Sequence, residues 1–286
     1  MALLLLVSVL WALSFGLTAQ VSGLGAAPVA ALRTFLAALV LLPFLRLRGL
    51  GARRMGLLLL TGAIQFGLMY LLYIAAFRWL RASEAALFTI FTPLFVTLFG
   101  LVLERRWAWT FLAAALLAVG GTAFCVWTDL GRPGLLLGFL LMQGANAAFA
   151  LGQLLYRRAS QGAGQGDLAL MGLVYLGAAG FTALALLLPG AGPGPSSVLG
   201  QATPRQLAIL AYLGVVASGL GFLLFNAGAR RVDLGTLAVM NNLKIPLAIL
   251  AAGLVFGERV DWLRLAIGGA LLGGALAVNR RAGEAP

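Results

Sequence analysis

Apolar residues in this chain form long continuous runs separated by short polar joints. The runs occupy residues 3–22, 27–47, 55–77, 84–103, 109–127, 134–156, 168–188, 205–227, 234–256 and 261–279. A helix of about 20 apolar residues crosses the roughly 30 Å of hydrocarbon in a bilayer. Membrane-spanning strands would instead alternate polar and apolar residues over about ten positions. The pattern therefore predicts an all-α integral membrane protein with ten transmembrane helices.

The joints between the runs are too short to form a soluble domain. The longest, 189–204, is rich in proline, glycine and serine, as loops are. With the N-terminus inside, twelve arginines fall on the cytoplasmic side and seven on the other. Because positive charge is enriched in cytoplasmic loops, we expect a multi-pass protein of the inner (plasma) membrane with both termini in the cytoplasm.

Composition agrees with this prediction and narrows the function. The chain is 62% hydrophobic and 10% charged, whereas a soluble domain is roughly 45–50% apolar and about 25% charged. The net charge of +12 comes from arginines between the runs, so membrane topology explains it better than binding of nucleic acid. One cysteine and no histidine argue against a disulfide framework and a Cys/His metal site. We expect no metal and no cofactor, and a lipid bilayer and a small solute as partners.

The chain contains an internal repeat. One block starts at Arg81, has Pro93 within its apolar run and ends with Glu104-Arg105; its counterpart starts at Arg231, has Pro246 and ends with Glu258-Arg259. We therefore predict two repeats, 1–127 and 134–281. Five spans per repeat is an odd number, so the second copy enters the membrane upside down. Inverted repeats are typical of transporters that expose one site alternately to each side.

Several short motifs extend this pattern along the chain. They are Leu10-Trp11-Ala12-Leu13-Ser14-Phe15, Ala31-Leu32-Arg33, Tyr73-Ile74-Ala75-Ala76-Phe77 and Ala82-Ser83-Glu84-Ala85-Ala86. Together with the two repeated blocks, they resemble the drug/metabolite transporter superfamily, in particular its ten-helix EamA-type exporters. The resemblance implies a secondary transporter of small organic solutes, such as amino acids or organic anions, that works mostly outward.

Other functions remain to be weighed against export. An uptake carrier of the same fold, for a carboxylate or a vitamin-like solute, is the nearest alternative, since a carrier that rocks between two states is reversible. A non-transporting structural membrane subunit is the alternative of another class, although it would not require an inverted repeat. An intramembrane enzyme would need paired carboxylates, a histidine set or a phosphate-binding motif in the membrane, and the sequence has none.

Lys244 is the strongest candidate for binding a solute. It is the only lysine and lies near the centre of the run 234–256, in Asn241-Asn242-Leu243-Lys244-Ile245-Pro246. A charge at this depth costs roughly 2.5–3.5 kcal/mol and usually faces an interior cavity. Our hypothesis is that Lys244 binds an anionic group, such as a carboxylate. The alternative is that it pairs with backbone carbonyls and only braces its helix.

The two central prolines mark corresponding spans. Pro93 and Pro246 are expected to interrupt their helices, and paired interrupted spans indicate a transport site. Phe91 stands two residues before Pro93, where Lys244 stands before Pro246. We therefore expect aromatic side chains of the first half, Phe91 among them, to contact the apolar part of the solute.

Uncharged polar residues share helix faces in three other runs. Gln143, Asn146 and Gln153 follow one face of the sixth run, Trp11, Ser14 and Thr18 one face of the first, and Thr61 and Gln65 one face of the third. Such groups hydrogen-bond a passing solute or join helices, where each bond is worth about 0.6–2 kcal/mol. Both interpretations stay open.

The remaining charged and small residues have structural interpretations. Arg33 is expected to snorkel to the outer surface; the alternative is that its fork holds a partner carbonyl or a substrate carboxylate. Glu104 and Glu258 are expected to cap turns and pair with adjacent arginines. The small residues of Gly269-xxx-Gly273 allow close packing within the bundle or in a homodimer. No carboxylate lies at the centre of any run, which argues against drug–proton exchange through a buried glutamate.

Overall fold

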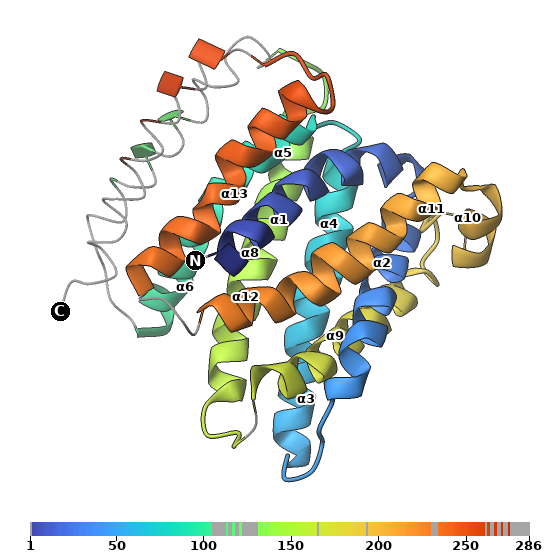
Figure 1. The fold of residues 1–286 in the computed structure, drawn as a ribbon, viewed down its shortest axis with the longest axis vertical. Coiled ribbons are helices and arrows are strands. Elements are labelled where there is room, and N and C mark those ends of the chain that lie inside the picture. Colours follow the sequence, from blue (N-terminus) through green and yellow to red (C-terminus); the bar gives the residue numbers. More distant parts are fainter. Residues whose placement is uncertain are drawn as a thin grey trace.

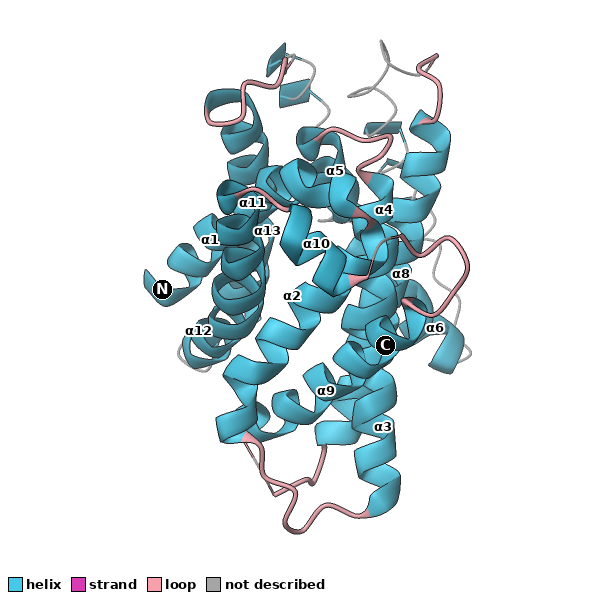
Figure 2. Cartoon of the chain, turned by 90° about the vertical axis from the view of Figure 1, so that its right-hand side faces the viewer, coloured by secondary structure: helices cyan, strands magenta, loops and turns pink. Residues whose placement is uncertain are grey.

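The computed structural model describes residues 2–104, 131–164, 166–192, 194–229 and 234–260, with isolated positions in 105–130 and 261–286. For residues 103–104, 195, 226–229 and 234–242 it describes the backbone alone. All regular elements in these ranges are helical (Figure 2). The described part of the chain is thus all-helical.

Before residue 105 the helices follow the predicted runs closely. They are α1 (Ala2–Val21), η1 (Ser22–Leu24), α2 (Ala26–Leu41), η2 (Leu42–Phe44), α3 (Ala52–Gly62), η3 (Ala63–Leu68), α4 (Met69–Ala76), α5 (Ala82–Phe88), η4 (Thr89–Phe91) and α6 (Thr92–Glu104). From residue 134 onward they are α8 (Leu135–Ser160), α9 (Asp167–Ala185), α10 (Pro195–Gln201), α11 (Pro204–Ala211), η6 (Tyr212–Leu220), α12 (Gly221–Ala229) and α13 (Leu234–Leu254).

Within the described residues, seven continuous helices are long and apolar enough to cross a membrane. They are Ala2–Leu24, Ala26–Phe44, Ala52–Ala76, Ala82–Val102, Leu135–Ser160, Asp167–Ala185 and Pro204–Phe225. The predicted run at 234–256 corresponds to α13, whose described apolar part is Leu243–Leu254. The runs 109–127 and 261–279 lie mostly outside the described residues, as does the Gly269-xxx-Gly273 motif. The number ten and the inverted repeat therefore stay predictions.

Helices from the first part of the chain pack against helices from the second part (Figure 1). α1 lies along α13, α2 contacts α9 and η6, and α4 contacts α8. The backbones of α3 and α9 touch, because a Cβ on Gly62 would lie 1.6 Å from the carbonyl oxygen of Val174. Small residues allow such close approach where lipid provides no hydrophobic force between helices.

At one end of the bundle, acidic side chains cap a helix and bind a loop. Glu258 follows α13, and its carboxylate accepts hydrogen bonds from the backbone N–H groups of Ala82 (2.7 Å) and Ser83 (3.0 Å) at the start of α5. Glu84 pairs with Arg132 at 2.6 Å. Glu258 thus caps a helix, as expected, but a helix distant in sequence, which no local pattern indicates. The side chain of Glu104 is not among those described.

Three of the described spans deviate from regular α-helix in their interior. The third predicted span contains a π-helical segment, η3, and the eighth contains another, η6. In the fourth span the 3₁₀ turn η4 immediately precedes the α6 turn that holds Pro93. The interruption expected at Pro246 is not seen, because α13 continues through this proline. Neighbouring helices in a membrane can satisfy the carbonyl that a proline frees.

Candidate solute-binding cavity

A cavity of about 130 Å³ lies inside the bundle. Its lining comes from α1, α2, η3, α4, η4, α6, α8, α12 and α13, and so from both predicted repeats. A site between two repeats is the arrangement expected of an alternating-access carrier. Four of the residues selected from the sequence line it, namely Lys244, Trp11, Ser14 and Asn146.

Lys244 faces the cavity from α13. Its side chain is half-buried, and its ammonium nitrogen lies 5.3 Å from the centre of the Trp11 ring. At this distance the ring quadrupole attracts a cation. The ammonium group therefore lies where a solute in the cavity could reach it.

Arg33 also lines the cavity, and the expectation that it snorkels to the surface was wrong. Only 4% of the residue is exposed. Its Nε donates a hydrogen bond to the hydroxyl of Ser218 (3.0 Å), and Nη1 donates to the hydroxyl of Thr18 (3.4 Å). The guanidinium carbon lies 4.1 Å from the centre of the Tyr70 ring. These partners, from three other spans, hold the charge inside the bundle and replace the water that snorkelling would provide.

The other predicted lining residues already hold bonds within the protein. The hydroxyl of Ser14 donates to the carbonyl of Trp11 (2.6 Å). The Asn146 amide donates to the carbonyl of Phe88 (2.8 Å) and accepts from the hydroxyl of Thr92 (3.1 Å). Asn146 therefore joins α8 to the broken fourth span at the cavity wall. These bonds agree with a link between helices, one of the two interpretations left open by the sequence, and its role in binding stays a prediction.

Four further candidates do not line this cavity. Gln143 accepts a hydrogen bond from Asn146 (3.2 Å), and Gln153 is half-buried elsewhere on α8. Gln65 is buried where η3 meets α8. The two helices lie so close there that a Cβ on Gly152 would lie 2.2 Å from the Cβ of Gln65. Phe91 is buried against Phe139, with ring centres 5.7 Å apart.

Asn241 and Asn242 belong to α13, but their side chains lie outside the described part of the chain. Their predicted role in binding therefore stays a prediction.

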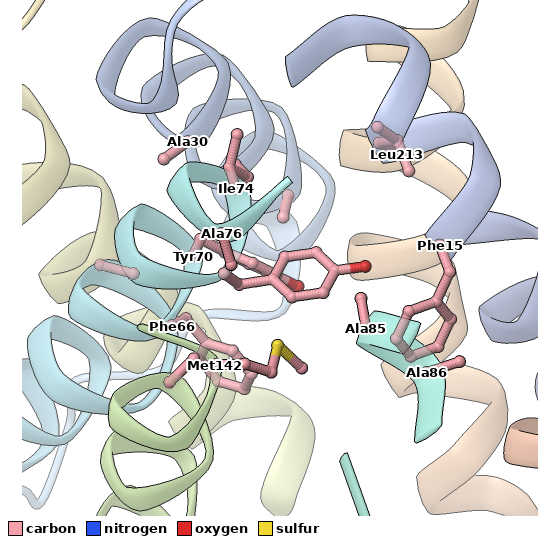
Figure 3. Packing of buried hydrophobic residues seen from close by; sticks show 14 of the residues in the cluster. Phe15, Ala30, Phe66, Tyr70, Ile74, Ala76, Ala85, Ala86, Met142 and Leu213 are labelled. Atoms are coloured by element: carbon pink, nitrogen blue, oxygen red, sulfur yellow. The ribbon is translucent and has the colours of Figure 1, made fainter. Parts of the chain in front are cut away.

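Sequence reasoning missed most of the aromatic wall. Phe66, Tyr70 and Tyr73 line the cavity from the third span, and Phe66 stacks on Tyr175 with centres 4.6 Å apart. Figure 3 shows Phe66 and Met142 on one side of this interior and Phe15 on the other. The spacing of Phe66, Tyr70 and Tyr73 by four and three residues places them on one helix face. That periodicity was the available signal, hidden within a continuously apolar run.

The cavity combines positive charge with apolar walls. Of the described residues that line it, two are cationic, Arg33 and Lys244, and none is acidic. A buried cation is stabilised by an anion that enters beside it. Such a cavity suits a solute with one anionic group and a sizeable apolar body.

Comparison with known protein families agrees with these features. The model of the EamA-like transporter family matches residues 1–127 and again residues 136–280. The chain belongs to the EamA-like transporter family. It is a membrane transporter and not an enzyme, as the sequence predicted.

The relatives of this EamA-like protein align with nearly its whole length. It is 40% identical to the "Probable biotin transporter" of Pseudomonas aeruginosa over 284 residues, covering 98% of this chain and 97% of the relative. It is 38% identical to the "Biotin transporter" of Salmonella typhimurium, over 98% of this chain and 93% of the relative. The "Biotin transporter" of Escherichia coli K12 is 37% identical with the same coverage.

A solved crystal structure has the same fold. It superimposes with a TM-score of 0.62 at 22% identity, covering 96% of this chain and 94% of the other. At this identity the likeness concerns the fold alone.

Proposed function

We propose that this protein takes up biotin, or a closely related vitamin carboxylate, across the bacterial inner membrane by alternating access. The observation that carries the proposal is the pair of cations, Arg33 and Lys244, in an aromatic-lined cavity between the two parts of the bundle. Relatives that share 37–40% of its residues are named biotin transporters.

The chemistry of biotin matches the cavity wall. Biotin has one carboxylate on an aliphatic chain and a compact bicyclic ring with a neutral ureido group. Lys244 binds the carboxylate, as the sequence suggested, and Arg33 adds to the positive potential that attracts it. The rings of Phe66, Tyr70 and Phe222 contact the apolar body. Pockets for small molecules commonly combine many apolar contacts with a few placed polar groups.

An amino acid fits this cavity less well than a simple carboxylate. Its ammonium group would enter a space whose described lining offers two positive charges and no negative one. Repulsion between like charges at low dielectric opposes its binding. Among the solutes expected from the sequence, the cavity therefore favours the organic anion over the zwitterion.

The proposed direction is inward, with both termini in the cytoplasm. The sequence resemblance favoured export, with uptake of a vitamin-like carboxylate as the alternative. The printed names of the relatives support that alternative through the solute they give. The twofold match of the family model, to 1–127 and 136–280, supports two inverted halves that rock around the site.

Uptake of radiolabelled biotin into proteoliposomes tests the proposal. Wild-type protein should accumulate biotin above protein-free liposomes, and Lys244→Gln should reduce the apparent affinity about 10-fold or more, since a hydrogen bond to a charged group contributes about 1.5–3 kcal/mol. Lys244→Arg keeps the charge and is the matched control, expected to retain most of the uptake.

Competition separates recognition of the carboxylate from recognition of the ring. Unlabelled biotin should compete fully, whereas biotinamide, which has the same ring but no charge, should compete at least about tenfold more weakly. Absence of biotin uptake by the wild type would overturn the proposed function. Equal competition by both compounds, or unchanged affinity in Lys244→Gln, would overturn the role of Lys244.

A further inference from the structure

At the junction between η6 and α12, the backbone carbonyl of Ala217 faces α1. Its partner on α1 is Trp11, which lines the cavity. The N–H of Gly221 donates to the carbonyl of Val216, five residues earlier, as in a π-helix. In a regular α-helix it would donate to Ala217, four residues earlier. The carbonyl of Ala217 instead accepts a hydrogen bond from the indole N–H of Trp11 at 2.8 Å.

The fit of the indole at this junction depends on a glycine. A Cβ on Gly221 would lie 2.9 Å from the indole nitrogen of Trp11. The ring packs against Phe222 (centres 5.4 Å apart) and Phe225 (5.3 Å) on α12. The indole of Trp11 therefore fits closely against the junction between η6 and α12. It would lose these contacts if the hydrogen-bond register of this helix changed.

The face of the same ring meets the proposed binding group. Lys244 Nζ lies 5.3 Å from the ring centre, and both residues line the cavity. One side chain of the first span thus contacts the ligand-binding cation of α13 and the backbone of the eighth span. π-Helical segments within α-helices occur frequently at functional sites.

We propose that Trp11 is a positioning residue that couples solute binding at Lys244 to the helical register of η6. This inference rests on the proposed function. A carboxylate that binds Lys244 competes with the indole face for the ammonium group. When Trp11 moves, the carbonyl of Ala217 loses its donor and accepts the N–H of Gly221. The carbonyl of Val216, which that N–H leaves, accepts the N–H of Leu220 in turn, so the π-turn becomes an α-turn. An α-turn holds fewer residues than a π-turn. The change of turn therefore rotates α12 about its axis and moves Phe222 relative to the cavity.

The reverse step explains why the bond matters for turnover. Without the indole N–H, the Ala217 carbonyl loses this hydrogen bond within the membrane, where an unsatisfied backbone group is costly. The protein would then remain in the α register and return slowly to the state with the bond. Loss of the bond should reduce the maximal rate more than the affinity for solute.

Trp11→Phe isolates the hydrogen bond, because phenylalanine keeps an aromatic face for Lys244 but has no N–H donor. In proteoliposomes its KM for biotin should stay within about threefold of wild type, and its Vmax should fall about tenfold, the effect of one hydrogen bond. Gly221→Ala should reproduce the loss of Vmax with the indole intact, because its methyl group displaces the ring.

Tyr212→Phe is the matched control. The hydroxyl of Tyr212 donates to the carbonyl of Leu10 at 2.9 Å, so it also joins η6 to α1, but it does not line the cavity. Its removal deletes a bond between the same two spans, and Vmax should stay within about twofold of wild type.

The outcomes separate this inference from the proposed function. Failure of the wild type to transport biotin refutes the function. Biotin transport by the wild type together with a normal Vmax in Trp11→Phe overturns the coupling. An equal loss of Vmax in Trp11→Phe and Tyr212→Phe overturns the coupling as well, because it indicates a structural role. A change confined to KM in Trp11→Phe also overturns the coupling, because it indicates a role in binding.

Discussion

Replacing Glu258 with glutamine tests the contact between the loop after α13 and the start of α5. The carboxylate accepts two backbone hydrogen bonds, at 2.7 and 3.0 Å, from Ala82 and Ser83. Glutamine keeps one acceptor oxygen and turns an N–H₂ group toward the other donor. The change removes one hydrogen bond to a charged acceptor, about 1.5–3 kcal/mol, and a favourable charge at a helix N-terminus, about 0.3–1 kcal/mol.

Because Glu258 is half-buried and water can partly replace the lost bond, we expect a loss near the lower end, about 2 kcal/mol in the free energy of unfolding. Unfolding by SDS in mixed micelles measures this difference, and hydrogen exchange at the amides of residues 82 and 83 should accelerate. Arg205→Gln, at an exposed position in the first turn of the eighth span, is a control for removing one charge. A loss below about 0.5 kcal/mol, or one equal to that of the control, would show that the cap does not stabilise the bundle.

Three other substitutions test separate parts of the structure. Gly62→Ala should destabilise the protein by about 2 kcal/mol or more in the same unfolding assay, because its methyl group meets the Val174 carbonyl. Gly56→Ala, in open space on the same helix, is the control and should be neutral or stabilising. Equal effects of the two substitutions would contradict the close contact. Arg33→Gln removes one of the two positive charges of the cavity, so half-maximal thermal stabilisation should require about tenfold more biotin; an unchanged requirement would show that Arg33 does not add to the potential that attracts the carboxylate. Asn146→Ala should lower stability by about 1 kcal/mol and leave KM within about threefold, since its amide joins helices; a large rise in KM would make it a solute ligand.

The spans were predictable because membrane thickness imposes a length and a composition on each of them. α1, α2, α8 and α9 follow the apolar runs within a few residues. The π-helical segment η6 was not predictable in this way. At its junction with α12, the carbonyl of Ala217 accepts a hydrogen bond from Trp11, more than 200 positions away in the chain, and hydropathy does not indicate such a contact.

The candidate site was predictable where a residue was chemically exceptional. Lys244, as the only lysine and in the middle of a run, could be selected from the sequence alone. Arg33 lies near the start of its run, where the local sequence favours snorkelling over burial. Ser218, 185 positions away, accepts its hydrogen bond and makes burial favourable. Such a contact follows from the packing of spans, which hydropathy does not specify.

The most direct test of the account is a cryo-EM structure of the protein with biotin bound in lipid nanodiscs. The account predicts biotin in the central cavity, its carboxylate within ion-pairing distance of Lys244 and its ring against Phe66, Tyr70 or Phe222. Biotin bound outside this cavity, or inside it with the carboxylate directed away from both Lys244 and Arg33, would contradict the account.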